Sequence, residues 1–259
     1  MKPNINFKQA VEIYQKKFFN DKYFKRNIFK IETHIESLKD WSEISSLKDL
    51  KKIFLKKQKK NIMKNKKINF KDTKNWIRDD KTGNIHHASK NFFSIEFVRV
   101  FGTKNREVVG KSWDQPLIKE KNKNGGILGI IRKKINNIPY YLVDFKAEPG
   151  NPDGIQISPC LQATYSNINQ FHGGRKPFFS KIFLNPKKYG FQILFEQLMS
   201  EDGGRFYKKK NKGMLIECPE TKNIKLRKNF YWLTLFQIKY LIKNKSWVNP
   251  HVRSIISHL

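Results

Sequence analysis

The sequence has few acidic residues, few cysteines and no long apolar run. Its 259 residues include 22 Asp and Glu against 53 Lys and Arg, which gives a formal net charge of +31. No stretch approaches the ~20 apolar residues that a membrane span needs, and the N-terminus lacks the apolar core of a signal peptide. The two cysteines, Cys160 and Cys218, are far apart and form no CxxC pair. We therefore expect a cytoplasmic protein with two reduced thiols and no membrane partner.

The motifs of the common cofactor-binding and hydrolytic sites are also missing. The sequence contains no Walker loop, no Rossmann glycine fingerprint, no G-x-S-x-G and no HExxH. Neither the cysteines nor the adjacent pair His86-His87 has the spacing of a zinc site. We therefore expect an activity without a cofactor and without a metal ion.

The excess of lysine and arginine indicates an anionic partner. One interpretation is a basic nucleic-acid-binding protein. The lysines are spread over the whole chain rather than gathered in one stripe, which argues against a specific nucleic-acid surface. A nucleoside diphosphate is an anion that the same charge would attract. We therefore expect no specific nucleic-acid partner.

The first 70 residues are predicted to be a helical extension. Phe7, Val11 and Tyr14 recur at helical spacing, and Ser46 can cap a second helix. A lysine-rich stretch follows and dilutes the apolar pattern, which places a domain boundary near residue 70. Residues 71–259 would then form one domain.

The second part of the chain alternates between strand and helix patterns. Strands are predicted at 92–101, with a mostly buried character, and at 127–132, 139–148, 155–167 and 205–218. Asn136-Asn137 would turn the second strand into the third as a hairpin. Helices are predicted at 190–200, after Thr234 and after Asn249-Pro250. The fold class is therefore α/β (α+β), a mixed sheet flanked by helices.

One predicted strand carries a charged face that could perform acid–base chemistry. Alternate side chains of a strand share a face, so Tyr141, Val143 and Phe145 would point into a core. The opposite face would carry Tyr140, Leu142, Asp144, Lys146 and Glu148. Charged groups about 6–7 Å apart can shift each other's pKa values. The same pattern is also that of an ordinary solvent-exposed face.

Polar side chains dominate the segment that follows. They are Gln156, Ser158, Gln162, Thr164, Ser166 and Asn167, and His172 comes next with Gly173-Gly174. Amides and hydroxyls at alternate positions are typical of a carbohydrate-sized pocket. His172 is the only side chain here whose ordinary pKa lies near neutrality. The alternative is an ordinary surface histidine.

Six further residues are weaker candidates for substrate binding. Trp113 could stack on a base, although a tryptophan more often lies in a core, and Gln115 shares its motif SWDQP. Arg205, Tyr207 and Lys209 alternate, and the two cations could bind a diphosphate or simply charge an edge strand. His87 lies in a short segment that could be a site loop or a turn.

Together these segments resemble the NDP-hexose 2,3-dehydratase family. The similarity runs in order over residues 76–259 and is carried by TGNIHHASKNFFSIEFVRV, SWDQPLI, GILGII, LVDFKAEPGNPDGIQISPCLQATYSN, FHGG, SEDGGRFYKKKNKGM and FYWLTLFQIKYLI. The resemblance implies a Nudix-like fold without the Nudix metal signature, and a cofactor-free dehydration of a dTDP-4-keto-6-deoxyhexose. Family members usually carry two copies of the unit and this chain carries one, from which we expect a homodimer.

The implied reaction needs one base, one acid and donors to an enolate oxygen. Lys146, Glu148 and His172 can fill these roles, and the sequence does not assign base and acid among them. Two other functions stay open. An isomerase or epimerase of a nucleotide-linked ketosugar would share the deprotonation but keep the C2 oxygen, and a basic nucleic-acid-binding protein would perform no chemistry.

Overall fold

The protein is described by a computed structural model that covers residues 5–102, 110–121, 125–171, 173–244 and 246–259. The helices are α1 Phe7–Phe18, α2 Ile28–Glu36, α3 Leu47–Lys59, α4 Tyr165–Ile168, α5 Ser180–Leu184, α6 Leu235–Ile242 and α7 Pro250–Ile256, with short 3-10 turns at Phe70–Asp72 and Lys187–Tyr189. The strands are β1 Trp76–Arg78, β2 Ile85–His87, β3 Ser94–Phe101, β4 Ser112–Lys119, β5 Ile127–Ile135, β6 Ile138–Ala147, β7 Ile155–Pro159, β8 Leu161–Ala163, β9 Gln192–Ser200, β10 Lys210–Cys218 and β11 Phe230–Leu233.

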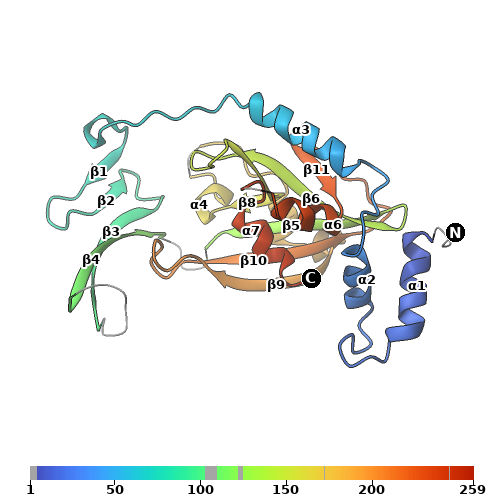
Figure 1. Cartoon of the computed structure of the whole chain (residues 1–259). Helices are drawn as coiled ribbons and strands as arrows, with labels where there is room; N and C mark the ends of the chain where they lie inside the picture. The colour runs from blue at the N-terminus through green and yellow to red at the C-terminus, as the bar shows by residue number, and fades with distance from the viewer. Residues whose placement is uncertain (1–4, 103–109, 122–124, 172, 245) are drawn as a thin grey trace.

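A mixed sheet forms the centre of the main body (Figure 1). Its strands run in the order β11-β6-β5-β10-β9, and β7 and β8 add to β6 and β5. The β5–β10 pair is parallel and the other neighbours are antiparallel. Helices α3, α6 and α7 contribute to the apolar cluster on one face, and α4 and α5 to the cluster on the other. This arrangement confirms the predicted α/β (α+β) class.

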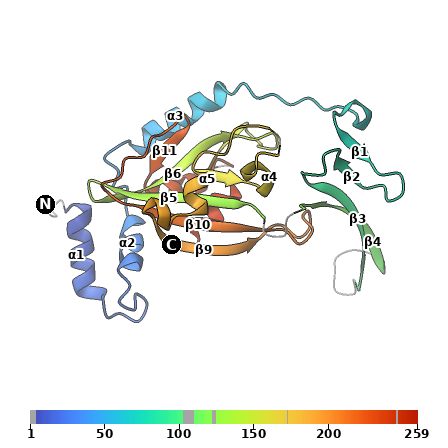
Figure 2. The ribbon, with the colours of Figure 1, turned by 180° about the vertical axis from the view of Figure 1, so that it is seen from behind.

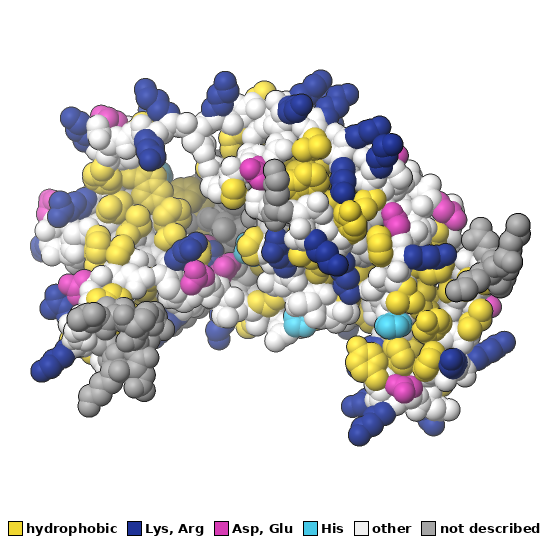
Figure 3. Space-filling model, in the orientation of Figure 1, with side chains coloured by type: hydrophobic (Ala, Val, Ile, Leu, Met, Phe, Trp, Pro, Cys, Tyr) yellow, Lys and Arg dark blue, Asp and Glu magenta, His cyan; other side chains and the backbone are white. Residues whose placement is uncertain are grey.

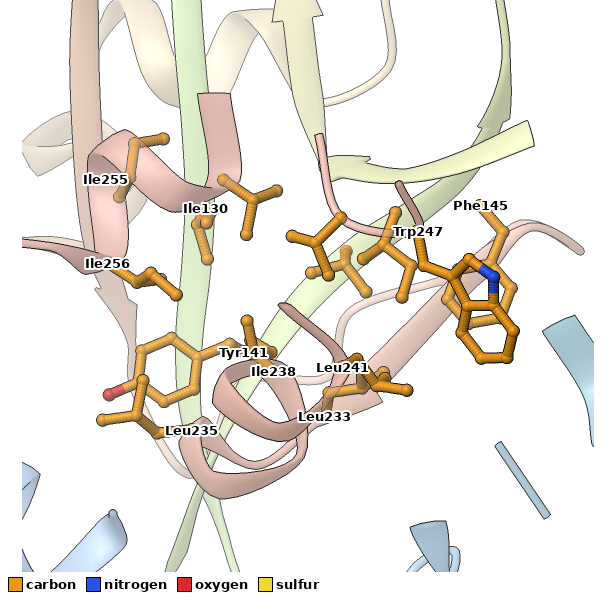
Figure 4. Close-up of a cluster of buried hydrophobic side chains, with 14 of the residues drawn as sticks. Ile130, Tyr141, Phe145, Leu233, Leu235, Ile238, Leu241, Trp247, Ile255 and Ile256 are labelled. Atoms are coloured by element: carbon orange, nitrogen blue, oxygen red, sulfur yellow. The ribbon is translucent and has the colours of Figure 1, made fainter. Parts of the chain in front are cut away.

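Both faces of β6 are buried, which corrects one part of the sequence prediction. Tyr141, Val143 and Phe145 point into the cluster under α6 and α7, as their alternation predicts (Figure 4). Leu142 and Tyr140 were expected on an open polar face and are instead fully buried. Leu142 packs in the cluster on the α5 side, and Tyr140 packs against the N-terminal helices. Only the second half of the strand, from Asp144 onward, leaves this face accessible.

Local sequence patterns placed several element boundaries correctly. Ser46, Thr234 and Asn249 each accept a hydrogen bond from a backbone N–H in the first turn of α3, α6 and α7. Asn136 and Asn137 have φ values of 51° and 63° and close the β5–β6 hairpin. Asparagine tolerates this left-handed region better than most residues, so the predicted hairpin is confirmed.

Four predictions of secondary structure were wrong in type or burial. Residues 192–200 form strand β9 rather than a helix, because they pair along their length with β10. Residues 205–209 form a turn in which Phe206 alone makes a bridge, to Ile118. Residues 165–168 form helix α4, because the Thr164 side chain caps it. Strand β3 is partly exposed rather than mostly buried.

The N-terminal helices pack onto the main sheet at two places. Helices α1 and α2 form an apolar cluster with Ile138 and Tyr140 of β6. Leu50 and Phe54 of α3 lie in the main core. The boundary near residue 70 stays a prediction. No helix among the residues that the structure covers is long and apolar enough to cross a membrane.

A buried charge network fixes α2 to the sheet. The guanidinium of Arg132 on β5, which is 1% exposed, contacts Glu32 Oε2 at 2.8 Å and Glu36 Oε1 at 2.7 Å. It also pairs with Glu217 of β10. The Tyr141 hydroxyl donates to Glu36 Oε2 at 2.7 Å. Burial raises the pKa of Glu36, although Arg132 and Tyr141 favour its ionised form.

The first four strands form a separate antiparallel sheet, in the order β1-β2-β3-β4. Figures 1 and 2 show this sheet to one side of the main body. The end of β4 joins it to the body, since Ile118 N–H donates to Arg205 O at 2.8 Å and Lys209 Nζ lies 2.7 Å from Glu120 Oε1. Figure 3 shows hydrophobic side chains gathered over this sheet. Phe97 and Phe101 are 55% and 72% exposed.

Replacing Arg132 by Ala should destabilise the fold strongly. The substitution leaves Glu36 buried without its cation, and breaking a buried ion pair in this way costs about 3–5 kcal/mol. Urea unfolding followed by circular dichroism measures the change. Arg99→Ala is the matched control, because Arg99 pairs with Asp114 on an exposed surface and its loss should change the unfolding midpoint little. Equal effects of the two substitutions would contradict the role assigned to the network.

Candidate active site

The polar end of β6 opens onto two cavities, and a third adjoins the second. The first, of about 350 Å³, is lined by Asp144, Lys146 and Gln162 among others, and we call it the carboxylate cavity. The second, of about 160 Å³, is lined by Leu128, Lys146, Glu148, Gln162, Ala163, Thr164, Asn167, Glu201, Lys209, Asn211 and His251. We call it the imidazole cavity. The third, of about 530 Å³, adds a set of aromatic rings to Thr164 and Asn167, and we call it the aromatic cavity.

Lys146 and Glu148 form an ion pair at the junction of the first two cavities. Lys146 Nζ lies 2.5 Å from Glu148 Oε1, and both side chains are about one third exposed. Lys146 Nζ also approaches the carbonyl oxygen of Gln162 at 3.5 Å. The alternation along β6 brings them together as predicted, because neither side chain can turn into the apolar core behind the strand. A proton donor and an acceptor therefore lie side by side within reach of solvent.

Asp144 lies two residues before Lys146, on the same face of β6, and lines the carboxylate cavity. Burial raises the pKa of Asp144 to about 6, and Glu148 adds to the rise, while Lys146 and Lys57 oppose it. The Asp144 side chain is only partly exposed within this cavity. A carboxyl with a pKa near 6 can hold or release a proton close to neutral pH.

His251 completes the imidazole cavity and was not identified from the sequence. It lies in the first turn of α7, more than 100 residues from β6, and shares the cavity with the Lys146–Glu148 ion pair and with Glu201 and Lys209. Burial lowers the pKa of His251 below the usual histidine value. Nearby Lys209 and Lys146 lower it further, whereas Glu201 and Glu148 raise it. Burial therefore favours the neutral imidazole, which is the form that can accept a proton. The pair Asn249-Pro250 predicted the start of α7, but no local pattern indicates which strand that helix packs on.

Three of the predicted polar residues hold α7 and the segment before it in place. Asn249 Nδ2 donates to Ser158 Oγ at 3.0 Å and to Gln162 Oε1 at 2.9 Å. Ser158 is fully buried, so it positions Asn249 rather than facing a cavity. Gln156 Nε2 donates to the carbonyl of Ser246 at 2.6 Å and supports the same segment. These contacts explain how the start of α7, with His251, is fixed beside β6.

The structure brings together another part of the predicted set. Thr164 Oγ1 lies 2.9 Å from Ser166 Oγ, and both line the aromatic cavity with Asn167. Lys209 lines the imidazole cavity, where Glu120 neutralises it. His172 lies outside the described residues.

The remaining predicted residues lie away from the three cavities. Tyr140 is buried, and its hydroxyl accepts a hydrogen bond from Glu43 N–H at 2.8 Å. Arg205 points into solvent beside Asp202, and Tyr207 contacts Lys119. The side chains of His87, Trp113 and Gln115 belong to the small sheet, where His87 Nδ1 lies 2.8 Å from Ser89 Oγ and Trp113 Nε1 donates to Gln115 Oε1 at 3.1 Å. The predicted strand face of Arg205, Tyr207 and Lys209 was therefore wrong, because the chain turns there.

Within the described ranges, no three His, Cys, Asp or Glu side chains lie close enough to hold a metal ion. Both cysteines are free and buried. Burial raises the pKa of Cys160 above its usual range, so this thiol is a poor nucleophile although it borders the carboxylate cavity.

Comparison with known proteins agrees with the resemblance seen in the sequence. A family model described as NDP-hexose 2,3-dehydratase matches residues 47–259. A dTDP-4-dehydro-6-deoxy-alpha-D-glucopyranose 2,3-dehydratase of Amycolatopsis orientalis is 34% identical over 201 residues, which are 77% of this chain and 41% of that protein. The enzyme of the same name from Saccharopolyspora spinosa is 34% identical over 197 residues, 76% of this chain and 39% of that protein. The chain thus spans about two fifths of the length of these relatives.

Among solved structures, an Ap4A hydrolase of C. elegans aligns with 52% of this chain and 98% of its own, at 12% identity and a TM-score of 0.30. A likeness at that score carries no weight, so the Nudix-like description stays a prediction from the resemblance.

The raised pKa of Asp144 predicts a pH-dependent gain in stability for Asp144→Asn. A carboxyl that holds its proton more tightly when folded makes the folded state lose stability as the pH rises from about 4 to about 6. Asparagine removes that loss. At pH 7 the variant should therefore be more stable than the parent by on the order of 1–3 kcal/mol, and the difference should vanish near pH 4. Urea unfolding of both proteins at pH 4, 5.5 and 7 measures it. A difference that does not change with pH would show that the Asp144 carboxyl is not perturbed.

Proposed function

Because the chain belongs to the NDP-hexose 2,3-dehydratase family, we propose that it removes water across C2 and C3 of a dTDP-linked 4-keto-6-deoxyhexose. The product is a 3,4-diketo-2,6-dideoxy sugar nucleotide, an intermediate of deoxysugar biosynthesis. The observation that carries the proposal is that Lys146, Glu148 and His251 line one cavity of hexose size. The names of the relatives support the dTDP-linked substrate.

The reaction follows from the acidity that a ketone gives to its neighbours. The hydrogen on C3 lies next to the C4 carbonyl, so a base can remove it and leave an enolate on the C4 oxygen. The C2 hydroxyl is β to that carbonyl and leaves as water when it receives a proton. The C2–C3 enol that remains tautomerises to the 3,4-diketone. The steps move protons and release water without a change in the net oxidation state, so the proposed reaction requires no redox cofactor.

The imidazole cavity supplies the groups for each proton transfer. The neutral imidazole of His251 takes the proton from C3 and returns it to the departing C2 oxygen, so the two transfers balance. The ammonium of Lys146 stabilises the negative charge that develops on the C4 oxygen. Glu148, at 2.5 Å from Lys146 Nζ, holds that ammonium in place. Gln162, Thr164 and Asn167 line the same wall and can bind the sugar hydroxyls.

Variants of His251 and Lys146 test this mechanism. His251→Ala and Lys146→Ala should each lower the rate of water loss by about 10²-fold or more, because each removes one proton-transfer or charge-stabilising group. The measurement is mass spectrometry of dTDP-4-keto-6-deoxyglucose incubated with the protein, in EDTA and without nicotinamide. The rate should also fall as the pH drops below the usual range of histidine titration, because the base must be neutral.

His258→Ala is the matched control for the first variant. His258 also lies near the C-terminus, but it lines none of the three cavities. Its ring stacks on that of Phe195, with the ring centroids 4.0 Å apart. It should retain the parent's rate. Normal turnover of the His251 and Lys146 variants would remove the imidazole cavity from the mechanism. Exchange of the C3 hydrogen without loss of water would indicate the isomerase or epimerase instead.

We also propose that the protein is a cytoplasmic homodimer that pairs through the small sheet. Phe97 and Phe101 lie on the same exposed face of β3, and Arg99 between them on that face pairs with Asp114 of β4. Large exposed apolar patches on a soluble domain are typical of interaction sites. A two-fold axis through this face would bury both phenyl rings of each copy. The buried free cysteines support a reducing compartment.

Sedimentation or light scattering at micromolar concentration tests the dimer. The parent should have twice the chain mass of 30.8 kDa, and Phe97→Lys with Phe101→Lys should reduce it to one chain, because the lysines place charge in the interface. Ile62→Lys is the control, because Ile62 is 93% exposed on the linker before the small sheet. A fully active species of one chain mass would rule out the dimer.

A further inference from the structure

The aromatic cavity is the largest of the three cavities, and its walls come from two separate parts of the fold. Phe92 and Phe93 lie between β2 and β3 of the small sheet, and Tyr165 and Phe171 lie in and after α4 of the main body. Figures 1 and 2 show α4 on the side of the body that faces the small sheet. Asn91, Glu120 and Lys121 complete the side of the small sheet.

Three of the four rings are partly exposed although they line a cavity. Phe93 is 39% exposed, and Tyr165 and Phe171 are each 41% exposed. Tyr165 and Phe171 meet edge to face, with centroids 6.0 Å apart and planes at 68°. This geometry leaves the face of at least one ring open to a planar ligand. Amide and hydroxyl groups of Ser166 and Asn167 line the main-body side and the amide of Asn91 the small-sheet side, and they can bond to the edge of such a ligand.

The aromatic cavity adjoins the imidazole cavity. Thr164 and Asn167 line both, so a ligand whose sugar lies beside Lys146 and His251 can extend directly toward the rings. The aromatic cavity has about 530 Å³ against about 160 Å³ for its neighbour, which matches a nucleoside in the larger space and a hexose in the smaller. Lys121 lines the aromatic cavity and supplies positive charge for a diphosphate, whereas Lys209 is already paired with Glu120.

We propose that the aromatic cavity binds the pyrimidine nucleoside of the sugar nucleotide, with the base stacked on the exposed rings of Phe93, Tyr165 and Phe171. This assignment rests on the proposed function for the identity of the substrate.

The carboxylate cavity is the competing position for the base, and it fits less well. Its one accessible ring is Phe178, which already has the guanidinium of Arg227 at 4.2 Å and contacts Phe179 and Phe230. An occupied ring offers no face for stacking. Arg227 can instead bind a phosphate, so the variant Arg227→Ala is tested as well.

Titration calorimetry with dTDP, which lacks the sugar, tests the assignment on the full chain. Tyr165→Ala and Phe171→Ala should each weaken dTDP binding by about tenfold or more, because base stacking on one aromatic ring contributes about that much. Tyr165→Phe keeps the ring and should bind as the parent does. Tyr240→Ala is the matched control, because Tyr240 is 39% exposed on α6 outside all three cavities.

The outcomes separate this assignment from the proposed function. Parent-like dTDP binding by both alanine variants would overturn it, as would a larger loss on Arg227→Ala than on Tyr165→Ala, or no binding of dTDP by the parent. Weakened binding in a chain that removes no water would support the nucleoside site and refute the dehydratase. Water loss with an unchanged KM in Tyr165→Ala and Phe171→Ala would support the dehydratase and refute the nucleoside site. Circular dichroism of each variant confirms that the fold is intact before binding is compared.

Discussion

The buried guanidinium of Arg132 is the constraint on which the arrangement of this molecule depends. A single cation on β5 gathers carboxylates from α2 and β10, and a hydroxyl from β6 joins the same group. Such a network tolerates little displacement, because each charge that loses its partner remains in an apolar interior. It therefore fixes where the N-terminal helices lie on the sheet. It also holds β5 and β6 together at the end of the sheet opposite the cavities.

At their other ends, the same two strands carry charged side chains that are partly exposed rather than buried. On β5, Leu128 lines the imidazole cavity four residues before Arg132. On β6, Asp144 and Lys146 follow Tyr141 by a few residues, and their charges are only partly compensated and partly hydrated. Stability is concentrated where buried carboxylates contact a buried cation, and reactivity where the charges stay partly exposed. Perturbed groups of the second kind are typical of sites that transfer protons.

The sequence predicted what depends on neighbours in the chain and missed what depends on distant partners. The caps at Ser46, Thr234 and Asn249 and the turn at Asn136-Asn137 are local, since each is set by a few adjacent residues. Residues 192–200 could not be assigned in this way, because their apolar spacing fits a helix and only the ladder with β10 makes them a strand.

The candidate site shows the same division between local and distant information. Alternation on β6 predicted that Lys146 and Glu148 lie together, and their ion pair follows from two residues of spacing. His251 is brought to them by the packing of α7 and by the bonds of Asn249 to Ser158 and Gln162. Tyr140 was misplaced for the same reason, because the helices that bury it come from a part of the chain about 100 residues earlier. A rule based on spacing along the chain contains neither fact.

The narrow joint between the small sheet and the main body has a consequence for the thermodynamics of binding. The end of β4 contributes the backbone bonds and the Lys209–Glu120 pair that hold the two parts together, so the small sheet can open as its own cooperative unit at less than the global free energy of unfolding. A molecule seated between Phe93 and Tyr165 would touch both units at once. Its binding free energy would then include the work of ordering that junction, so affinity and local amide protection of β1–β4 would be linked quantities.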